Sequence, residues 1–179
     1  REFLDEYMGM YQSIRDAGYI ALITGNHDDH PRIADGRTMQ MMKIVYTFIL
    51  TMPGTPIIYN GDELGMKFQH GLASKEGGYI RTGVRTPMQW SDGLNSGFSN
   101  CDPSDLYLPV GKEFNEINVL SQENDPGSLL NFVRLMTELR KKYPALASNG
   151  DFEPLYAESG KLPFIYRRRT DNENYLIAV

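Results

Sequence analysis

The sequence contains a single cysteine, Cys101, among its 179 residues. No disulfide can form within the chain, and a cysteine-rich metal site is excluded. There is no apolar run of the roughly 18 residues that a membrane-spanning helix requires, and the charged stretch from Arg1 to Glu6 does not have the pattern of a signal peptide. These absences suit a reducing compartment, so we expect a cytoplasmic protein with no membrane partner.

An excess of positive charge is also missing. The 18 Lys and Arg residues face 23 Asp and Glu residues, which gives a formal net charge of −5. Nothing in this balance attracts nucleic acid. The tight basic run from Arg167 to Arg169 falls in an expected strand, where a solvated edge is a simpler interpretation than a phosphate site.

The chain is too short for a closed eightfold β/α barrel, which typically needs about 250 residues. Hydrophobic residues nevertheless make up 41% of the sequence and charged residues 23%. This composition is that of a globular chain that can bury a core.

What the sequence does contain is the pattern of an α/β protein. Apolar residues between Phe3 and Ile14 recur at spacings of three and four, which predicts an amphipathic helix. The short apolar runs 19–24 and 56–59 indicate buried strands. Between them, Thr38 can cap a helix that ends near Met52. The order strand, helix, strand indicates a β/α unit with parallel strands.

The second half of the chain has a different organisation. Residues 61–125 show no periodicity, and loops of this length in compact domains are usually functional. Asp125 and Pro126 then predict the start of a helix that ends near Tyr143. Three short runs, 152–157, 162–168 and 175–179, predict antiparallel strands. The change of pattern places a domain boundary close to residue 147.

The first candidate site follows the first expected strand and reads Asn26-His27-Asp28-Asp29-His30-Pro31-Arg32. Reactive groups in parallel α/β folds gather where strands end. A carboxylate beside an imidazole and an arginine can bind vicinal hydroxyls or stabilise a developing cation. A polar turn that merely caps the strand is the simpler interpretation. His27, Asp28 and His30 could also bind a metal, but their spacing is not a recognised zinc arrangement, so we expect no metal here.

Two further motifs contain polar and aromatic groups. Asp62 and Glu63 follow the second expected strand, within reach of the first turn, although capping of a tight loop between Gly61 and Gly65 explains them more simply. Trp90 and Phe98 lie in the long loop. Their rings suit sugar faces, but they could equally pin the loop.

The ordered series of motifs resembles the α-amylase superfamily, glycoside hydrolase family 13, and in particular its oligo-1,6-glucosidase, α-glucosidase and trehalose synthase branch. The resemblance rests on Gly25-Asn26-His27-Asp28, on the run from Pro53 to Met66, on Arg85-Thr86-Pro87-Met88-Gln89-Trp90, and on the run from Asp125 to Lys141. It implies the C-terminal part of a (β/α)8 TIM barrel. Residues 1–147 would form its last two β/α units, and residues 148–179 would begin an antiparallel β-sandwich.

The resemblance also implies roles for individual residues. Asp28 would be the catalytic carboxylate that grips the sugar and favours its oxocarbenium-like form. His27, Arg32 and Arg85 would bind the substrate, with Arg32 shaping the pocket. Asp29 and His30 depart from the Gln-Pro that commonly precedes this arginine, so the resemblance does not define the sugar preference of the neighbouring subsite. The family's chemistry is retaining, and its nucleophile and acid/base residue would precede Arg1. The metal sites of the family also lie mostly upstream, so the resemblance implies no cofactor for these residues.

We therefore expect a fragment of an enzyme that cleaves α-glucosidic bonds in malto- or isomalto-oligosaccharides or related α-glucans. A transglycosylase or isomerase such as trehalose synthase is the alternative, since both outcomes share one covalent intermediate. A non-catalytic carbohydrate-binding module is a third hypothesis. The isolated chain should be inactive, and its exposed barrel edge could support self-association.

Overall fold

The structure of the chain is a computed structural model that describes residues 2–28, 31–74 and 80–179. The fold divides into two compact units, each assembled from separate stretches of chain. The first unit comprises Arg1–Leu22, Ile44–Ile57 and Leu135–Val179, and the second comprises Ile23–Lys43 and Ile58–Arg134.

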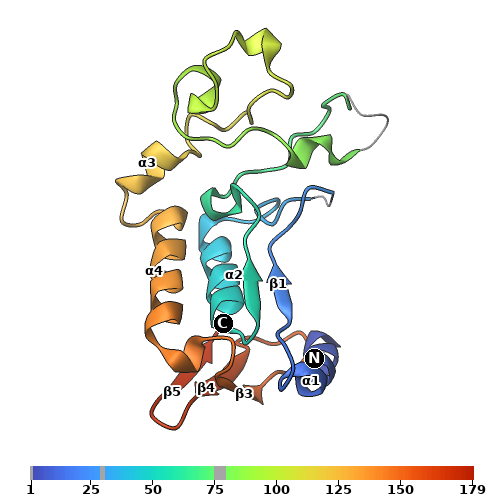
Figure 1. The fold of residues 1–179 in the computed structure, drawn as a ribbon, viewed down its shortest axis with the longest axis vertical. Helices are drawn as coiled ribbons and strands as arrows, with labels where there is room; N and C mark the ends of the chain where they lie inside the picture. The colour runs from blue at the N-terminus through green and yellow to red at the C-terminus, as the bar shows by residue number, and fades with distance from the viewer. Residues whose placement is uncertain (1, 29–30, 75–79) are drawn as a thin grey trace. The chain divides into compact units, whose positions relative to one another are not determined.

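The expected strand, helix, strand pattern is present. Helix α1 (Glu2–Ile14) is followed by strand β1 (Ala21–Ile23), helix α2 (Met39–Thr51) and strand β2 (Thr55–Ile57). Strands β1 and β2 are hydrogen-bonded neighbours and run in the same direction (Figure 1). The Thr38 hydroxyl accepts the Met41 N–H at 3.2 Å, which confirms Thr38 as the cap of α2.

Aromatic side chains form the core of the first unit. Tyr7 and Tyr11 of α1 pack with Met52, Phe152 and Tyr166, all of them buried. The rings of Tyr7 and Phe152 meet edge to face, with centroids 5.8 Å apart. The Tyr7 hydroxyl donates to the Pro53 carbonyl at 2.6 Å, so this buried polar group is satisfied. The apolar face predicted for α1 is therefore the face that the core buries.

The three strands predicted near the C-terminus are present and antiparallel. Strands β3 (Asp151–Tyr156), β4 (Ile165–Arg169) and β5 (Asn174–Ala178) form one sheet in that order. In the register, Phe152 lies opposite Arg168 and Arg168 lies opposite Tyr175.

The interpretation of Arg167 to Arg169 as a solvated edge is wrong for the middle residue. Arg168 is fully buried and donates to the carbonyls of Ala147 (2.6 Å), Gly150 (3.1 Å) and Thr51. Desolvation, followed by the charge of Arg140, lowers the pKa of Arg168 to about 10. Because side chains alternate along a strand, its two neighbours instead face Glu153 and Asp151 at the surface.

The start of the last helix also differs from the prediction. Helix α4 spans Leu129–Lys142, so Asp125 lies outside it. The Ser128 hydroxyl accepts the Asn131 N–H at 3.2 Å and caps the helix. Asp125 instead accepts the Gly127 N–H at 2.8 Å and closes the preceding turn.

The long segment without periodicity folds into short helical turns. These are η1 (Asp62–Leu64), η2 (Ile80–Val84), η3 (Leu94–Gly97), η4 (Pro103–Asp105) and α3 (Val119–Glu123), with η5 (Pro144–Leu146) after α4. Leu64, Met66, Ile117 and Leu130 form the core of the second unit. Buried Gln122 donates to the Leu64 carbonyl at 2.8 Å, so an amide replaces a missing backbone partner.

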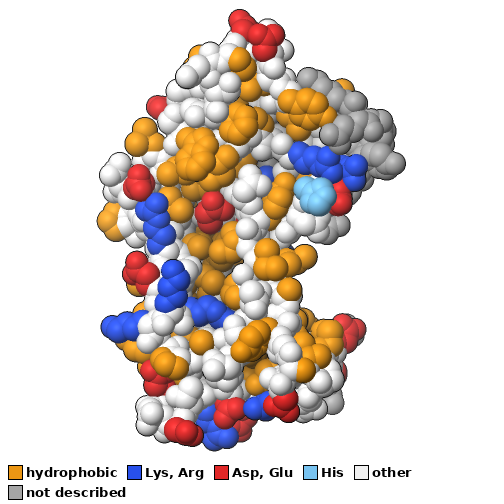
Figure 2. Space-filling model, viewed as in Figure 1, with side chains coloured by type: hydrophobic (Ala, Val, Ile, Leu, Met, Phe, Trp, Pro, Cys, Tyr) orange, Lys and Arg blue, Asp and Glu red, His pale blue; other side chains and the backbone are white. Residues whose placement is uncertain are grey.

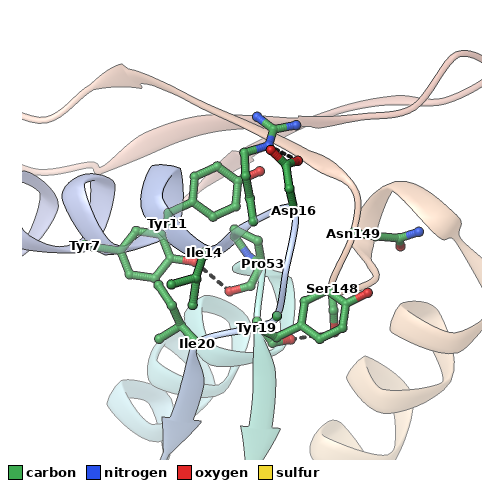
Figure 3. Close-up of a pocket in the computed structure, with 12 residues that line it drawn as sticks. Tyr7, Tyr11, Ile14, Asp16, Tyr19, Ile20, Pro53, Ser148 and Asn149 are labelled. Carbon is green, nitrogen blue, oxygen red and sulfur yellow. Dashed lines mark hydrogen bonds and ion pairs between the residues drawn. The ribbon is translucent and has the colours of Figure 1, made fainter.

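A small pocket lies in the first unit, lined by Tyr7, Tyr11, Tyr19, Pro53 and Asn149 among others (Figure 3). None of the predicted site residues lines it. On the face shown in Figure 2, hydrophobic side chains lie between charged ones over much of the surface. Within the described part of the chain, no helix is long and apolar enough to cross a membrane.

Candidate active site

The turn after β1 presents His27 and Asp28 at the surface. The Asn26 side-chain oxygen accepts the Asp28 N–H at 2.7 Å, a short-range bond typical of Asx turns. The side chains of His27 and Asp28 are 67% and 48% exposed. Both groups are therefore open to a ligand while the backbone between them is held.

Three side chains surround the Asp28 carboxylate. His27 Nε2 lies 3.2 Å from Oδ2, while Arg81 and Arg85 approach Oδ1 at 2.6 and 3.0 Å. Arg85 also donates from Nε to the His27 carbonyl at 2.9 Å, which ties it to the turn. The structure thus brings together His27, Asp28 and Arg85, which the sequence analysis singled out.

The electrostatics of this cluster favour an ionised Asp28. Partial desolvation by itself would raise the pKa of the carboxyl. The charges of His27 and Arg81, with hydrogen bonds from Arg85 and Arg81, outweigh it and hold the pKa of Asp28 below its ordinary value.

Sequence reasoning missed Arg81. It belongs to η2, and its guanidinium makes the 2.6 Å ion pair with Asp28. Arg81 lies in a segment without hydrophobic periodicity and 53 positions from Asp28, so no local pattern in the sequence connects the two residues.

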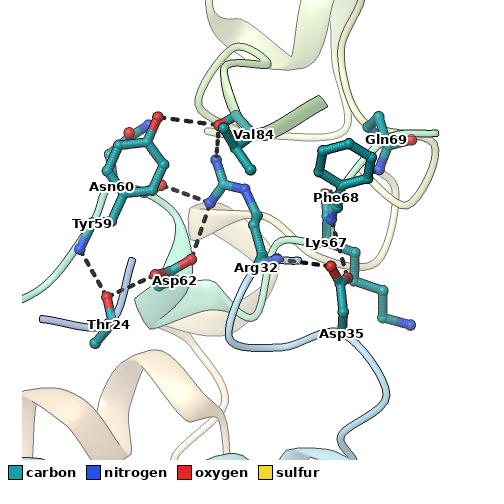
Figure 4. Close-up of polar contacts among 10 residues, drawn as sticks. All are labelled: Thr24, Arg32, Asp35, Tyr59, Asn60, Asp62, Lys67, Phe68, Gln69 and Val84. Atoms are coloured by element: carbon teal, nitrogen blue, oxygen red, sulfur yellow. Dashed lines mark hydrogen bonds and ion pairs between the residues drawn. The ribbon is translucent and has the colours of Figure 1, made fainter. Parts of the chain in front are cut away.

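Arg32 occupies a different position from the other predicted site residues. Its side chain is 1% exposed, and it donates to the Asn60 carbonyl (2.9 Å), to Asp62 Oδ1 (3.1 Å) and to the Val84 carbonyl (2.7 Å) (Figure 4). The Tyr59 ring lies 5.0 Å from its Cζ. Arg32 therefore joins the turn after β1 to the segment after β2 and to η2.

Asp62 connects the ends of the two parallel strands. The Thr24 hydroxyl donates to Asp62 Oδ2 at 2.7 Å and accepts the Tyr59 N–H at 2.9 Å. Burial raises the pKa of Asp62, while Thr24 and Arg32 oppose this shift. Asp62 is thus within reach of the first turn, as expected, through Thr24 and Arg32.

Glu63 and the glycines around it form a tight turn. Gly61 and Gly65 have φ values of 85° and 81°, a conformation that favours glycine, as the loop interpretation requires. Burial raises the pKa of Glu63, although backbone N–H groups oppose the shift.

Other predicted elements of the site are less constrained. Asp29 and His30 lie outside the described residues. Among residues 2–28, 31–74 and 80–179, no group of three His, Cys, Asp or Glu side chains could hold a metal ion. Trp90 and Phe98 are 51% and 52% exposed, so part of each ring faces solvent.

Comparison with known proteins identifies the family. The α-amylase catalytic domain matches residues 2–149. The chain belongs to the α-amylase family. Trehalose synthase/amylase TreS of Mycobacterium tuberculosis is 37% identical over 118 residues, covering 64% of this chain and 18% of that protein. A probable oligo-1,6-glucosidase of Bacillus subtilis is 30% identical over 199 residues, covering 92% and 34%.

Solved structures of the α-amylase family agree with this membership. A trehalulose synthase mutant in complex with the substrate sucrose superimposes with a TM-score of 0.84 at 28% sequence identity. That match covers 100% of this chain and 37% of the other. The α-amylase-family chain described here thus spans between 18% and 37% of these relatives. The resemblance to the oligo-1,6-glucosidase and trehalose synthase branch is confirmed.

Proposed function

We propose that the chain forms the last two β/α units of a TIM barrel and the start of a β-sandwich, with the boundary near residue 147. The parallel pair β1 and β2, with α2 between them, supports the first part. The antiparallel sheet of β3, β4 and β5 supports the second. In this arrangement, β1 and β2 correspond to the seventh and eighth barrel strands.

Within this barrel, Asp28 is the carboxylate that stabilises the transition state of a retaining glycosidase. The single observation that carries the proposal is the exposed Asp28 carboxylate at the end of β1, held ionised by His27, Arg81 and Arg85. A preorganised negative charge stabilises the positive charge that develops at the anomeric carbon. His27 and Arg85 bind the same sugar, and Arg32 shapes the site beneath them. The nucleophile and the acid/base residue come from another part of the enzyme.

The activity that fits these residues is hydrolysis of α-glucosidic bonds in malto- or isomalto-oligosaccharides or related α-glucans. The names of the relatives support two outcomes, because they include both oligo-1,6-glucosidases and trehalose synthases. Both outcomes follow from one covalent glycosyl-enzyme. Water completes hydrolysis, and a sugar hydroxyl completes isomerisation.

Product analysis of the full-length enzyme on maltose tests this proposal. Glucose as the sole product supports hydrolysis, whereas trehalose would identify an isomerase. Binding of both maltose and isomaltose without any product from either would contradict both and favour a carbohydrate-binding role. The matched control is Asp28→Asn, for which formation of either product should fall roughly 100- to 1,000-fold.

A further inference from the structure

The buried pair of Arg32 and Asp62 lies directly behind the exposed site. Both side chains are 1% exposed, with Arg32 and Asp62 Oδ1 3.1 Å apart. A buried guanidinium is costly unless its charge is paired and its donors find acceptors. Asp62 supplies the charge, and the carbonyls of Asn60 and Val84 accept two further hydrogen bonds, while Arg32 Nε finds no acceptor among the described residues.

The bond to Val84 links this pair to the site. Val84 directly precedes Arg85, and the Val84 carbonyl and the Arg85 N–H belong to one planar peptide group. Arg32 donates to that carbonyl at 2.7 Å, and the Tyr59 hydroxyl donates to it at 3.1 Å. Two donors therefore fix the orientation of the peptide from which the Arg85 side chain starts.

Arginine suits this role better than lysine would. Its planar fork can donate to the Asp62 carboxylate and to the Val84 carbonyl at the same time. The ammonium group of a lysine, on its shorter side chain, can approach the Asp62 carboxylate or the Val84 carbonyl, but it cannot donate to both in this planar geometry. The Tyr59 ring beneath the guanidinium further restricts its orientation.

We propose that Arg32, with its charge neutralised by Asp62, is a positioning residue that fixes the Val84 carbonyl and thereby holds Arg85 against Asp28. It acts through Arg85 and does not touch the substrate. The inference rests on the proposed function only for its kinetic consequence, because the geometry can be tested without any substrate.

The first experiment measures the pKa of the Asp28 carboxyl by carbon-13 NMR in three proteins. These are the unmodified chain, Arg32→Lys and the double variant Arg32→Met/Asp62→Leu. The double variant removes both buried charges, so it avoids the unpaired carboxylate that a single Arg32→Met change would leave. Arg37→Lys is the matched control, since Arg37 is exposed and donates from Nη1 to the Ile33 carbonyl.

We expect the pKa of Asp28 to rise toward its ordinary value in both Arg32 variants and to stay unchanged in Arg37→Lys. Asp102 serves as an internal reference because hydrogen bonds from Ser104 lower its pKa within the same unit. An unchanged Asp28 would overturn the inference. A parallel rise of Asp102 would also overturn it, because a general loss of structure would then explain the result.

The second experiment measures kcat and KM of the full-length enzyme with the same substitutions. Misplacement of Arg85 should lower kcat/KM roughly 10- to 100-fold in both Arg32 variants. A raised Asp28 pKa with unchanged kinetics would support the positioning role and contradict the proposed role of Arg85 in substrate binding, because Asp28 itself stays ionised at neutral pH. An unchanged pKa with reduced kinetics would overturn the positioning role and leave the proposed function standing.

Discussion

At the scale of single residues, the two arginines of the site differ in burial: the Arg85 side chain is partly exposed beside Asp28, whereas the Arg32 side chain is buried. The motif after the first strand predicted that His27 and Asp28 would be presented together, and the Asx bond of Asn26 shows how this happens. The burial of Arg32 could not be predicted, because it depends on carbonyl groups 28 and 52 positions away in sequence. No local pattern records such distant backbone partners.

Asp28→Asn is the direct test of the proposed catalytic carboxylate. The amide keeps the shape of the side chain but removes the charge that stabilises the developing cation. We expect kcat of the full-length enzyme to fall roughly 100- to 1,000-fold, with an unchanged circular dichroism spectrum. Asp171→Asn, an exposed position in the first unit, should leave kcat as it was. Turnover near the unmodified rate would contradict the role of Asp28.

Arg81→Gln tests the arginine that the sequence analysis missed. The lowered pKa of Asp28 means that its ion pairs contribute stability above the unfolded-state pKa, and this contribution is lost as pH falls through the folded-state value. Without Arg81 the pKa of Asp28 should rise, and the Asp28 ion pairs should then contribute less to the pH dependence of the free energy of unfolding. Carbon-13 titration of the carboxyl measures this. Arg167→Gln, which removes an equal charge from a pair with Glu153, should have no effect on Asp28.

At the scale of elements, hydrophobic periodicity predicted the helices and strands well and their capping less well. The spacing of apolar residues predicts α1 because a helix that packs on any core needs one apolar face, whichever residues it packs against. Ser128 rather than Asp125 caps α4. The sequence does not distinguish the two positions, because Ser and Asp can each cap a helix or close a turn. Arg168 is buried because a cluster of backbone carbonyls accepts its donors, and these carbonyls have no signature in the sequence.

Two glycines of the first unit should respond in opposite directions to alanine. Gly9 lies in α1 with open space where a Cβ would stand, so Gly9→Ala should stabilise the chain by about 0.5–1 kcal/mol. Gly54 has a φ of 118°, and a Cβ there would overlap the Ile20 carbonyl oxygen. Gly54→Ala should destabilise the chain by about 1–3 kcal/mol. Midpoints of urea unfolding measure both, and shifts of the same sign would contradict this account.

At the scale of the whole molecule, the sequence predicted the order of helices and strands along the chain but not the division into two units. Each unit combines segments from distant parts of the chain, such as Arg1–Leu22 and Leu135–Val179. Local periodicity carries no information about such pairings, which depend on shape and packing. The family resemblance supplied what periodicity could not, namely the expectation of a β/α barrel segment.

The two-stranded sheet predicts self-association of the 179-residue chain. In the described chain, β1 and β2 pair only with each other, so each presents one unpaired edge. Ile23 in β1 is 52% exposed. Open edges pair with further strands, so the weight-average mass in sedimentation equilibrium should rise with concentration. Ile23→Lys should weaken this association, whereas Ile44→Lys, on α2 with 54% exposure, should not. An equal effect of both would indicate general hydrophobic association instead.

The 179-residue chain should not hydrolyse an α-glucoside by itself. Retaining hydrolysis requires a carboxylate nucleophile and an acid about 5–5.5 Å apart on either side of the scissile bond. Asp28 is held by His27, Arg81 and Arg85, while Asp62 is 1% exposed and paired with Arg32, so neither provides that pair. Release of nitrophenol from a chromogenic α-glucoside should stay at the buffer rate. Turnover by the chain that disappears in Asp28→Asn would contradict this prediction and locate the complete reaction within these residues.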